Sequence, residues 1–206
     1  MRSGPKVIGG IFGFAALAVG VLLFWRPFAG TKPQELPDLG PMPRFHLVDQ
    51  EERPMDNGAL VGHLTVVQVV CSRCAAASPV LLSRFAEIDQ NFRRSDRLRL
   101  ISLTAEPAAD PPAVLAAIGV RYEATDHWSF LTGEESELTR VAVALLGSNQ
   151  PAASSALTQA AVGAQVGLVD GRGRLRRVYN GLDDDFVASV LSDAGTLLRS
   201  PEKRSK

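Results

Sequence analysis

Runs of apolar residues that are β-branched or alternate with polar ones predict the strands of this chain. Residues 65–70 are the most apolar such run, broken only by Gln68, which is the composition of a buried central strand. Residues 98–104 alternate and then run apolar, so we expect a second core strand there. Residues 165–170 and 175–179 flank Gly171-Arg172-Gly173 and predict a hairpin. Shorter strands are expected at residues 44–49 and 128–131.

Helices are predicted where apolar residues recur every three or four positions. Residues 75–92, 134–146 and 183–198 have this spacing. Asp110 followed by Pro111 and Pro112 predicts a further helix start, with the aspartate as its cap and proline in its first turn. Strands that alternate with helices and end in a hairpin and a helix are typical of an α/β, thioredoxin-like fold, a central mixed sheet flanked by helices.

The amino-terminal residues differ from the rest of the chain. Residues 7–25 are uncharged and apolar over a length that spans a bilayer as a helix, and Arg2 and Lys6 precede them. A cleaved signal peptide is the alternative, but the run is long for a signal and no clear cleavage site follows. We therefore expect an N-terminal transmembrane helix within a membrane anchor at residues 1–26, with the bulk of the chain outside the cytoplasm.

Composition separates the remaining regions and limits the function. Residues 27–43 carry five prolines and predict an extended stalk, residues 44–199 the folded domain, and residues 200–206 a disordered charged tail. The 22 basic and 22 acidic residues balance, so nothing favours nucleic acid as a partner. Two cysteines are too few for a disulfide scaffold or a structural zinc site.

Those two cysteines, Cys71 and Cys74, directly follow the expected central strand and lie at the expected start of the next helix. Amide N–H groups and the helix dipole favour a thiolate there, and Arg73 adds positive charge. Cys-x-x-Cys after a strand is a redox signature of thioredoxin-like folds, and Pro79 follows at the thioredoxin spacing. The alternative is a pair of buried structural cysteines. We expect Cys71, as the more exposed, to attack a partner disulfide and Cys74 to resolve the mixed disulfide.

Four further motifs make residues 45–198 resemble the Sco (SenC/PrrC) family of membrane-anchored, thioredoxin-fold proteins. Phe45-His46-Leu47-Val48-Asp49-Gln50 is similar to the family's opening strand, and residues 100–107, followed by Asp110, Pro112 and Leu115, to its "ISvDPerDTPevL" segment. Trp128-Ser129-Phe130-Leu131-Thr132-Gly133 matches its "WxFLTG" block, and Leu168-Val169-Asp170 with Gly173 its late hairpin. The resemblance implies assembly of the binuclear copper centre of cytochrome oxidase, by delivering copper, by reducing the acceptor's cysteines, or both.

The copper ligands that the resemblance implies are incomplete. The family motif is C-x-x-x-C-P with a distant histidine. Cys74 and Pro79 match it, but Ser78 stands at the second cysteine and no histidine lies near residues 162–163. Ala164 stands where thioredoxin-like proteins carry a cis-proline. Cys71 is an additional thiol outside the family motif.

Cu(I) is soft and accepts two thiolates, so Cys71 and Cys74 remain possible Cu(I) ligands. Cu(II) prefers imidazole, and the chain has three histidines. We expect His46 and His63 to be surface residues and consider His127 a possible ligand or proton shuttle. The acidic run at residues 183–185 is interpreted as helix capping rather than a metal site.

Together these features predict a single-pass protein of the bacterial inner membrane whose domain faces the periplasm. The expected activity is thiol–disulfide oxidoreductase chemistry at Cys71 and Cys74, which requires no cofactor. The expected partner is a respiratory copper oxidase subunit or another disulfide-bearing client. Two alternatives stay open: a Cu(I) chaperone that uses the same cysteines, and a redox-inactive assembly scaffold.

Overall fold

The computed structural model describes residues 35–73, 77–146 and 164–199. Its strands are β1 (Gly40–Pro41), β2 (His46–Asp49), β3 (Pro54–Asp56), β4 (Leu64–Val70), β5 (Leu98–Thr104), β6 (Trp128–Thr132), β7 (Gln165–Val169) and β8 (Arg174–Asn180). Its helices are η1 (Asn57–Leu60), α2 (Ala77–Phe92), α3 (Pro112–Arg121), α4 (Glu135–Leu146) and α6 (Phe186–Arg199). The expected strands and helices are confirmed, whereas β1, β3 and η1 were not predicted.

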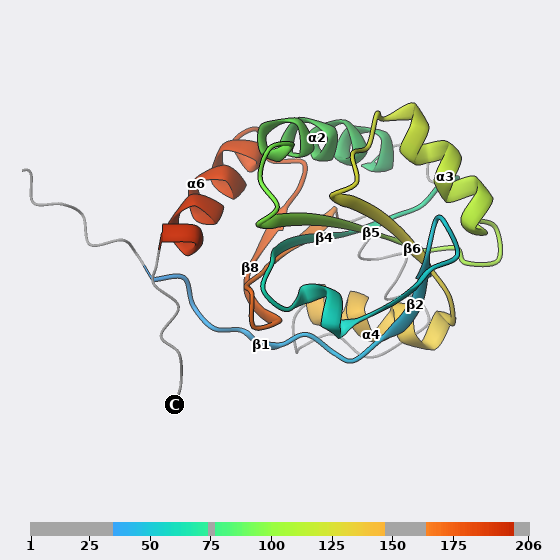
Figure 1. The fold of residues 1–206 in the computed structure, drawn as a ribbon, viewed down its shortest axis with the longest axis horizontal. Coiled ribbons are helices and arrows are strands. Elements are labelled where there is room, and N and C mark those ends of the chain that lie inside the picture. Colours follow the sequence, from blue (N-terminus) through green and yellow to red (C-terminus); the bar gives the residue numbers. More distant parts are fainter. Residues whose placement is uncertain (1–34, 74–76, 147–163, 200–206) are drawn as a thin grey trace, which may run out of the picture. The chain divides into compact units, whose positions relative to one another are not determined.

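Within the described part of the chain the strands form one mixed sheet in the order β1-β8-β7-β4-β5-β6-β2-β3. Strands β4, β5 and β6 are parallel, and β7 and β2 pair antiparallel with β4 and β6. Helices α2, α3 and α6 cover one face of the sheet, and α4 and η1 cover the other (Figure 1). This arrangement is the thioredoxin-like α/β fold expected from the order of the elements.

Strand β4 is buried along its whole length because both faces of the sheet are covered. Val66 and Val70 join the cluster beneath α2 and α6, whereas Val67 and Val69 join the cluster beneath α4. Successive side chains of a strand point to opposite faces, so an uninterrupted apolar run fits this position. Burial of each valine stabilises the fold by about 1.5–3 kcal/mol.

The compact unit begins at Leu36, earlier than the expected domain boundary at Arg44. Leu36 and Met42 are buried, and β1 pairs with β8. Arg176 reinforces this contact by donating hydrogen bonds to the backbone oxygens of Leu36 and Pro37. The proline-rich segment folds onto the domain here because prolines are compatible with an edge strand.

The expected anchor and tail lie outside the described residues, as do residues 27–34 of the expected stalk. Among the residues that the structure describes, no helix has the length and apolar character needed to cross a membrane.

Candidate functional site

Cys71 directly follows the carboxyl end of β4 and is only 2% exposed. It packs in the cluster beneath α4 and is disulfide-bonded. The chain's one other cysteine, Cys74, lies outside the described residues. The expectation that Cys71 is the exposed thiol is therefore wrong, because the end of the central strand is covered on both faces.

Cys71 precedes the following helix in the sequence but contacts its first described turn, where the Ser78 Oγ accepts the Cys71 N–H. Helix α2 begins at Ala77, and residues 72–73 form a turn after the strand.

Glu106, two residues after the neighbouring strand β5, faces the sulfur of Cys71. In the register of the parallel pair β4–β5, Val70 lies beside Thr104, and the Ala105 N–H donates to the Val70 oxygen at 2.7 Å. The Glu106 carboxylate Oε2 consequently lies 3.1 Å from the Cys71 Sγ. A reduced Cys71 thiol can donate its proton along this contact, whereas a disulfide sulfur has no proton to donate.

Arg73 forms an ion pair with the same carboxylate. Its Nε donates to Glu106 Oε2 at 3.2 Å and its Nη2 to Oε1 at 3.0 Å, which is a forked contact. These hydrogen bonds from Arg73 to Glu106, together with the opposite charge, raise the pKa of the Arg73 guanidinium. The charge that was expected to favour a Cys71 thiolate is thus engaged by a carboxylate, which itself disfavours a thiolate beside it.

A buried polar network positions Glu106. The Thr104 Oγ1 accepts the Glu106 N–H at 2.9 Å and donates to the Asp110 carboxylate. Asp110 is fully buried and does not cap α3, whose cap is Pro111 without a side-chain hydrogen bond. The expectation that Asp110 caps this helix is wrong, because the Thr104 hydroxyl holds its carboxylate in the preceding loop.

Ser78 ties α2 to the end of β4. Its Oγ accepts the Cys71 N–H at 3.0 Å, and the residue is 3% exposed. Ser78 occupies the position of the second cysteine in the family motif. In place of a thiol it has a hydroxyl, which accepts a hydrogen bond from the Cys71 backbone. This contact fixes the Cys71 backbone against the helix.

Ala164 lies at the same edge of the sheet, beside the end of β4. It is buried and has a φ of 52°, a left-handed conformation that costs an alanine about 1–2 kcal/mol. Its carbonyl accepts the Gly181 N–H at 2.7 Å. A Cβ at Gly181 would lie 2.2 Å from Leu81 Cδ2 and 3.1 Å from the Ala164 oxygen. Glycine at 181 is thus required for the close approach that holds Ala164 in place.

The histidines lie away from Cys71. His127 immediately precedes β6, and its carbonyl accepts the Leu100 N–H, so it lies at the opposite edge, about 20 Å along the strands. His63, in the turn before β4, lies at that far edge too. His46 lies near the Cys71 edge but three strands away, about 14 Å across the sheet. His127 is therefore not placed as a ligand or proton shuttle for Cys71.

The donor set does not fit Cu(II). Among the described residues no group of three or more His, Cys, Asp or Glu side chains could hold a metal ion. All three histidines of the chain are among those residues, so none of them completes the family's ligand set. Cys71 offers a soft sulfur, which suits Cu(I) rather than Cu(II).

Glu106 was not predicted as a site residue, although the sequence carries a signal for it. Residues just after two adjacent parallel strands meet at one edge of the sheet. Cys71 follows one predicted strand, and Glu106 closely follows the other. The sequence alone did not show that these two strands are neighbours in the sheet.

Comparison with known proteins agrees with this fold. No match was found among curated protein sequences. The structure is similar to BsSco, described as "a member of the Sco family of cytochrome c oxidase assembly proteins" with a disulfide switch, with 20% identity and a TM-score of 0.67 over 82% of this chain and 100% of that one. It is also similar to a SCO1/SenC family lipoprotein from Bacillus anthracis (17% identity, TM-score 0.62, 78% and 96% covered). Yeast Sco1 with copper bound is a third such structure (20% identity, TM-score 0.56, 77% and 94% covered).

These structural likenesses concern the fold, because the identities are low. The sequence pattern of the SCO1/SenC family matches residues 34–192, which is well over half of the chain and nearly the whole described domain. The chain belongs to the SCO1/SenC family.

Proposed function

We propose that this protein is a thiol–disulfide oxidoreductase that uses Cys71 and Cys74 and assists assembly of the copper centre of cytochrome c oxidase. The observation that carries the proposal is the disulfide-bonded Cys71 at the carboxyl edge of the sheet, in contact with the Glu106 carboxylate. A buried structural disulfide gains nothing from an acid–base group beside it, whereas a resolving cysteine reacts faster when a neighbouring group accepts its proton.

In this proposal the two cysteines exchange the roles that the sequence suggested, and the burial of Cys71 supports the exchange. A thiolate must reach the disulfide that it attacks, and Cys71 is 2% exposed. Cys74 is the chain's other cysteine, so in this mechanism it attacks. The Cys74 thiolate bonds to one sulfur of the client disulfide, the client S–S bond breaks, and the other client sulfur leaves as a thiolate.

Cys71 then resolves the mixed disulfide. The Cys71 thiol gives its proton to Glu106, and its sulfur bonds to Cys74 Sγ while the bond between Cys74 and the client breaks. The client leaves as a dithiol after taking up two protons, and the protein is left with a Cys71–Cys74 disulfide. The client gains two electrons and the protein loses two, so a dithiol reductant must regenerate the protein.

The family and the sequence support the proposed client and the proposed location. BsSco is described as a member of a family of cytochrome c oxidase assembly proteins, which favours a respiratory copper oxidase subunit as the client. The apolar residues 7–25 and the lipoprotein from B. anthracis favour a membrane-anchored protein whose domain faces the periplasm. Alkaline carbonate extraction should leave the full-length chain in the membrane pellet. Release of a shortened soluble product would contradict the anchor.

A Cu(I) chaperone is the second candidate, because relatives have been solved with copper bound and two thiolates suit Cu(I). The two candidates separate in one experiment on the reduced full-length chain. Under the proposal it reduces insulin disulfides in copper-free buffer, with a dithiol present to regenerate it. Stoichiometric, tight Cu(I) binding without that reduction would favour the chaperone. Absence of both activities would leave a redox-inactive scaffold.

A further inference from the structure

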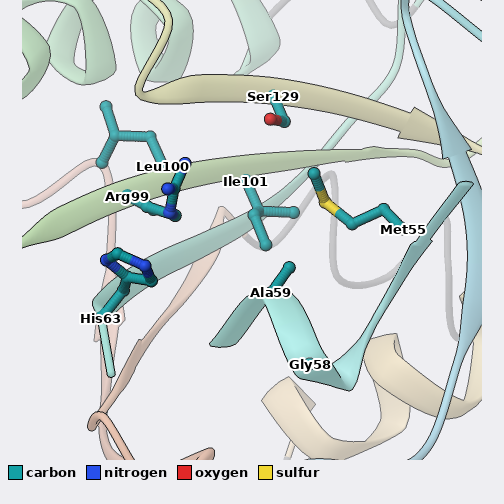
Figure 2. Close-up of a pocket in the computed structure, with 8 residues that line it drawn as sticks. All are labelled: Met55, Gly58, Ala59, His63, Arg99, Leu100, Ile101 and Ser129. Atoms are coloured by element: carbon teal, nitrogen blue, oxygen red, sulfur yellow. The ribbon is translucent and has the colours of Figure 1, made fainter. Parts of the chain in front are cut away.

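A second candidate site lies at the edge of the sheet opposite to Cys71. It is a pocket of about 230 Å³ lined by residues of β3, η1, β5 and β6 and by the turn before β4 (Figure 2). Apart from Leu100, which packs in the cluster beneath α2 and α6, its side chains lie on the face of the sheet that η1 and α4 cover. The proposed exchange reaction uses none of its residues.

The floor and one wall of the pocket are apolar. Ile101 of β5 is 4% exposed, and Met55 and Ala59 approach it from β3 and η1 (Figure 2). A surface of this kind favours an aliphatic group over water, at about 25 cal/mol for each Å² that is buried. The volume suits a chain of about four to six carbons, which is smaller than a drug-sized ligand.

Ser129 adds a hydroxyl group that has no hydrogen-bond partner among the described residues. It is 9% exposed, lines the pocket, and makes no hydrogen bond through its side chain to any described residue. Ser129 lies beside Ile101 in the register of β5 and β6, so its hydroxyl stands at the edge of the apolar floor (Figure 2). Its Oγ is not among the fully buried polar atoms of the described residues, so the hydroxyl can bond to water or to a ligand in the pocket.

Arg99 supplies a cation. Arg99 lines the same pocket and is half-buried, and no carboxylate in the described part of the chain pairs with it. Arg99 and Ile101 share one face of β5, so Arg99 and Ser129 are diagonal neighbours, about 7–8 Å apart at the backbone. A planar carboxylate placed between them can accept hydrogen bonds from the guanidinium and from the hydroxyl.

His63 completes the polar end of the pocket, near Arg99 (Figure 2). Its Nδ1 lies 2.9 Å from the Asp96 carbonyl oxygen, which only accepts, so Nδ1 carries the proton. The Asp96 side chain is turned to solvent, 3.9 Å from His127 Nε2, and does not pair with Arg99.

From this juxtaposition we infer that the pocket binds a small aliphatic carboxylate. The carboxylate bonds to Arg99 and Ser129, and its hydrocarbon tail lies on Ile101, Met55 and Ala59. The three features are independent: an apolar floor, an unpaired cation and an unpartnered hydroxyl. A neutral molecule of the same size would leave the Arg99 charge unpaired and would gain only the apolar contact.

The test is a titration of the full-length protein with hexanoate, followed by ligand-observed NMR, with hexanol as the neutral control. Hexanoate should bind saturably, and hexanol should bind at least tenfold more weakly. Arg99→Gln should weaken hexanoate binding by about tenfold or more, and Ser129→Ala by severalfold. Arg94→Gln, which removes an exposed arginine outside the pocket, should leave the affinity unchanged.

Three results would overturn the inference: no saturable hexanoate binding, equal binding of hexanol, or equal weakening in Arg94→Gln. Insulin reduction by the same Arg99→Gln protein tests the proposed exchange site separately from the pocket. A peptide that ends in leucine, with its carboxyl group free or amidated, distinguishes a polypeptide C-terminus from a free carboxylate as the source. If the peptide with the free carboxyl group displaces hexanoate and the amidated peptide does not, the pocket recognises a polypeptide C-terminus.

Discussion

Glu106 has the most informative side chain of the candidate site, because it contacts both Cys71 and Arg73. In the proposed mechanism its carboxylate takes the Cys71 proton when the internal disulfide closes. Glu106→Gln keeps the size of the side chain and removes that acceptor. Closure should slow by about a hundredfold, so the mixed disulfide with the client should persist. Quenched-flow alkylation with mass spectrometry measures this rate.

The matched control is Arg73→Gln, which breaks the ion pair but leaves the carboxylate in place. If Glu106 acts as the proton acceptor, this variant keeps most of the closure rate. Closure by Glu106→Gln should also speed up steeply as pH rises, since hydroxide then removes the proton. A flat pH profile, or an equal loss in both variants, would assign Glu106 a purely structural role.

The positions of the histidines lead to a prediction about copper. No histidine lies beside Cys71, so a Cu(II) complex lacks the imidazole ligand that it prefers. Cu(II) added to the reduced full-length chain should give no strong thiolate-to-copper absorption band. A stable, coloured 1:1 complex would contradict this prediction and would implicate His46, the histidine at the same edge of the sheet.

At the scale of elements, Asp49 closes the hairpin of β2 and β3. Its buried carboxylate accepts hydrogen bonds from the backbone N–H groups of Glu51 and Arg53, at 2.8 and 2.9 Å. It also accepts one from the Arg53 side chain. Burial acts to raise the pKa of Asp49, but these hydrogen bonds outweigh it and hold the pKa below its ordinary value. Asp49→Asn should lower the free energy of unfolding by about 1–3 kcal/mol at neutral pH, measured by urea denaturation.

The difference in unfolding free energy between wild type and Asp49→Asn depends on pH. Because the folded pKa of Asp49 is depressed, its contribution is complete well above pH 3.8, the ordinary value, and is lost as pH falls through the folded pKa. The gap between wild type and Asp49→Asn should therefore shrink in acid. Glu51→Gln retains the backbone donor and should change stability by less than about 0.5 kcal/mol. A gap that widens in acid would contradict this assignment.

Elements with a strong pattern could be predicted from the sequence, and short ones could not. Strands β4 and β5 and helix α2 carry long apolar patterns that decide their structure locally. Strands β1 and β3 have two and three residues, contain proline, and exist because β8 and β2 pair with them. Asp110 has an ordinary capping sequence, but the Thr104 hydroxyl at the end of β5 holds its carboxylate once the connecting loop folds.

At the scale of the whole molecule, the order of the strands brings the candidate site together. The sequence identified Cys71 as a redox candidate but assigned it the wrong exposure, because burial depends on α4 and η1 covering one face of the sheet. The contacts of Glu106 and the pocket at Arg99 likewise depend on strands that are separated in sequence. Local pattern gives the type of an element, and only the assembled sheet gives its neighbours.

The roles of the two cysteines are the central claim, and mixed-disulfide trapping tests them most directly. Reduced full-length Cys71→Ser and Cys74→Ser proteins are each mixed with a peptide disulfide and analysed by mass spectrometry without reductant. We predict that Cys71→Ser accumulates the mixed disulfide through Cys74, and that Cys74→Ser accumulates little because the remaining thiol is buried beside a carboxylate. The reverse pattern would make Cys71 the attacking residue, and trapping by neither variant would contradict thiol exchange altogether.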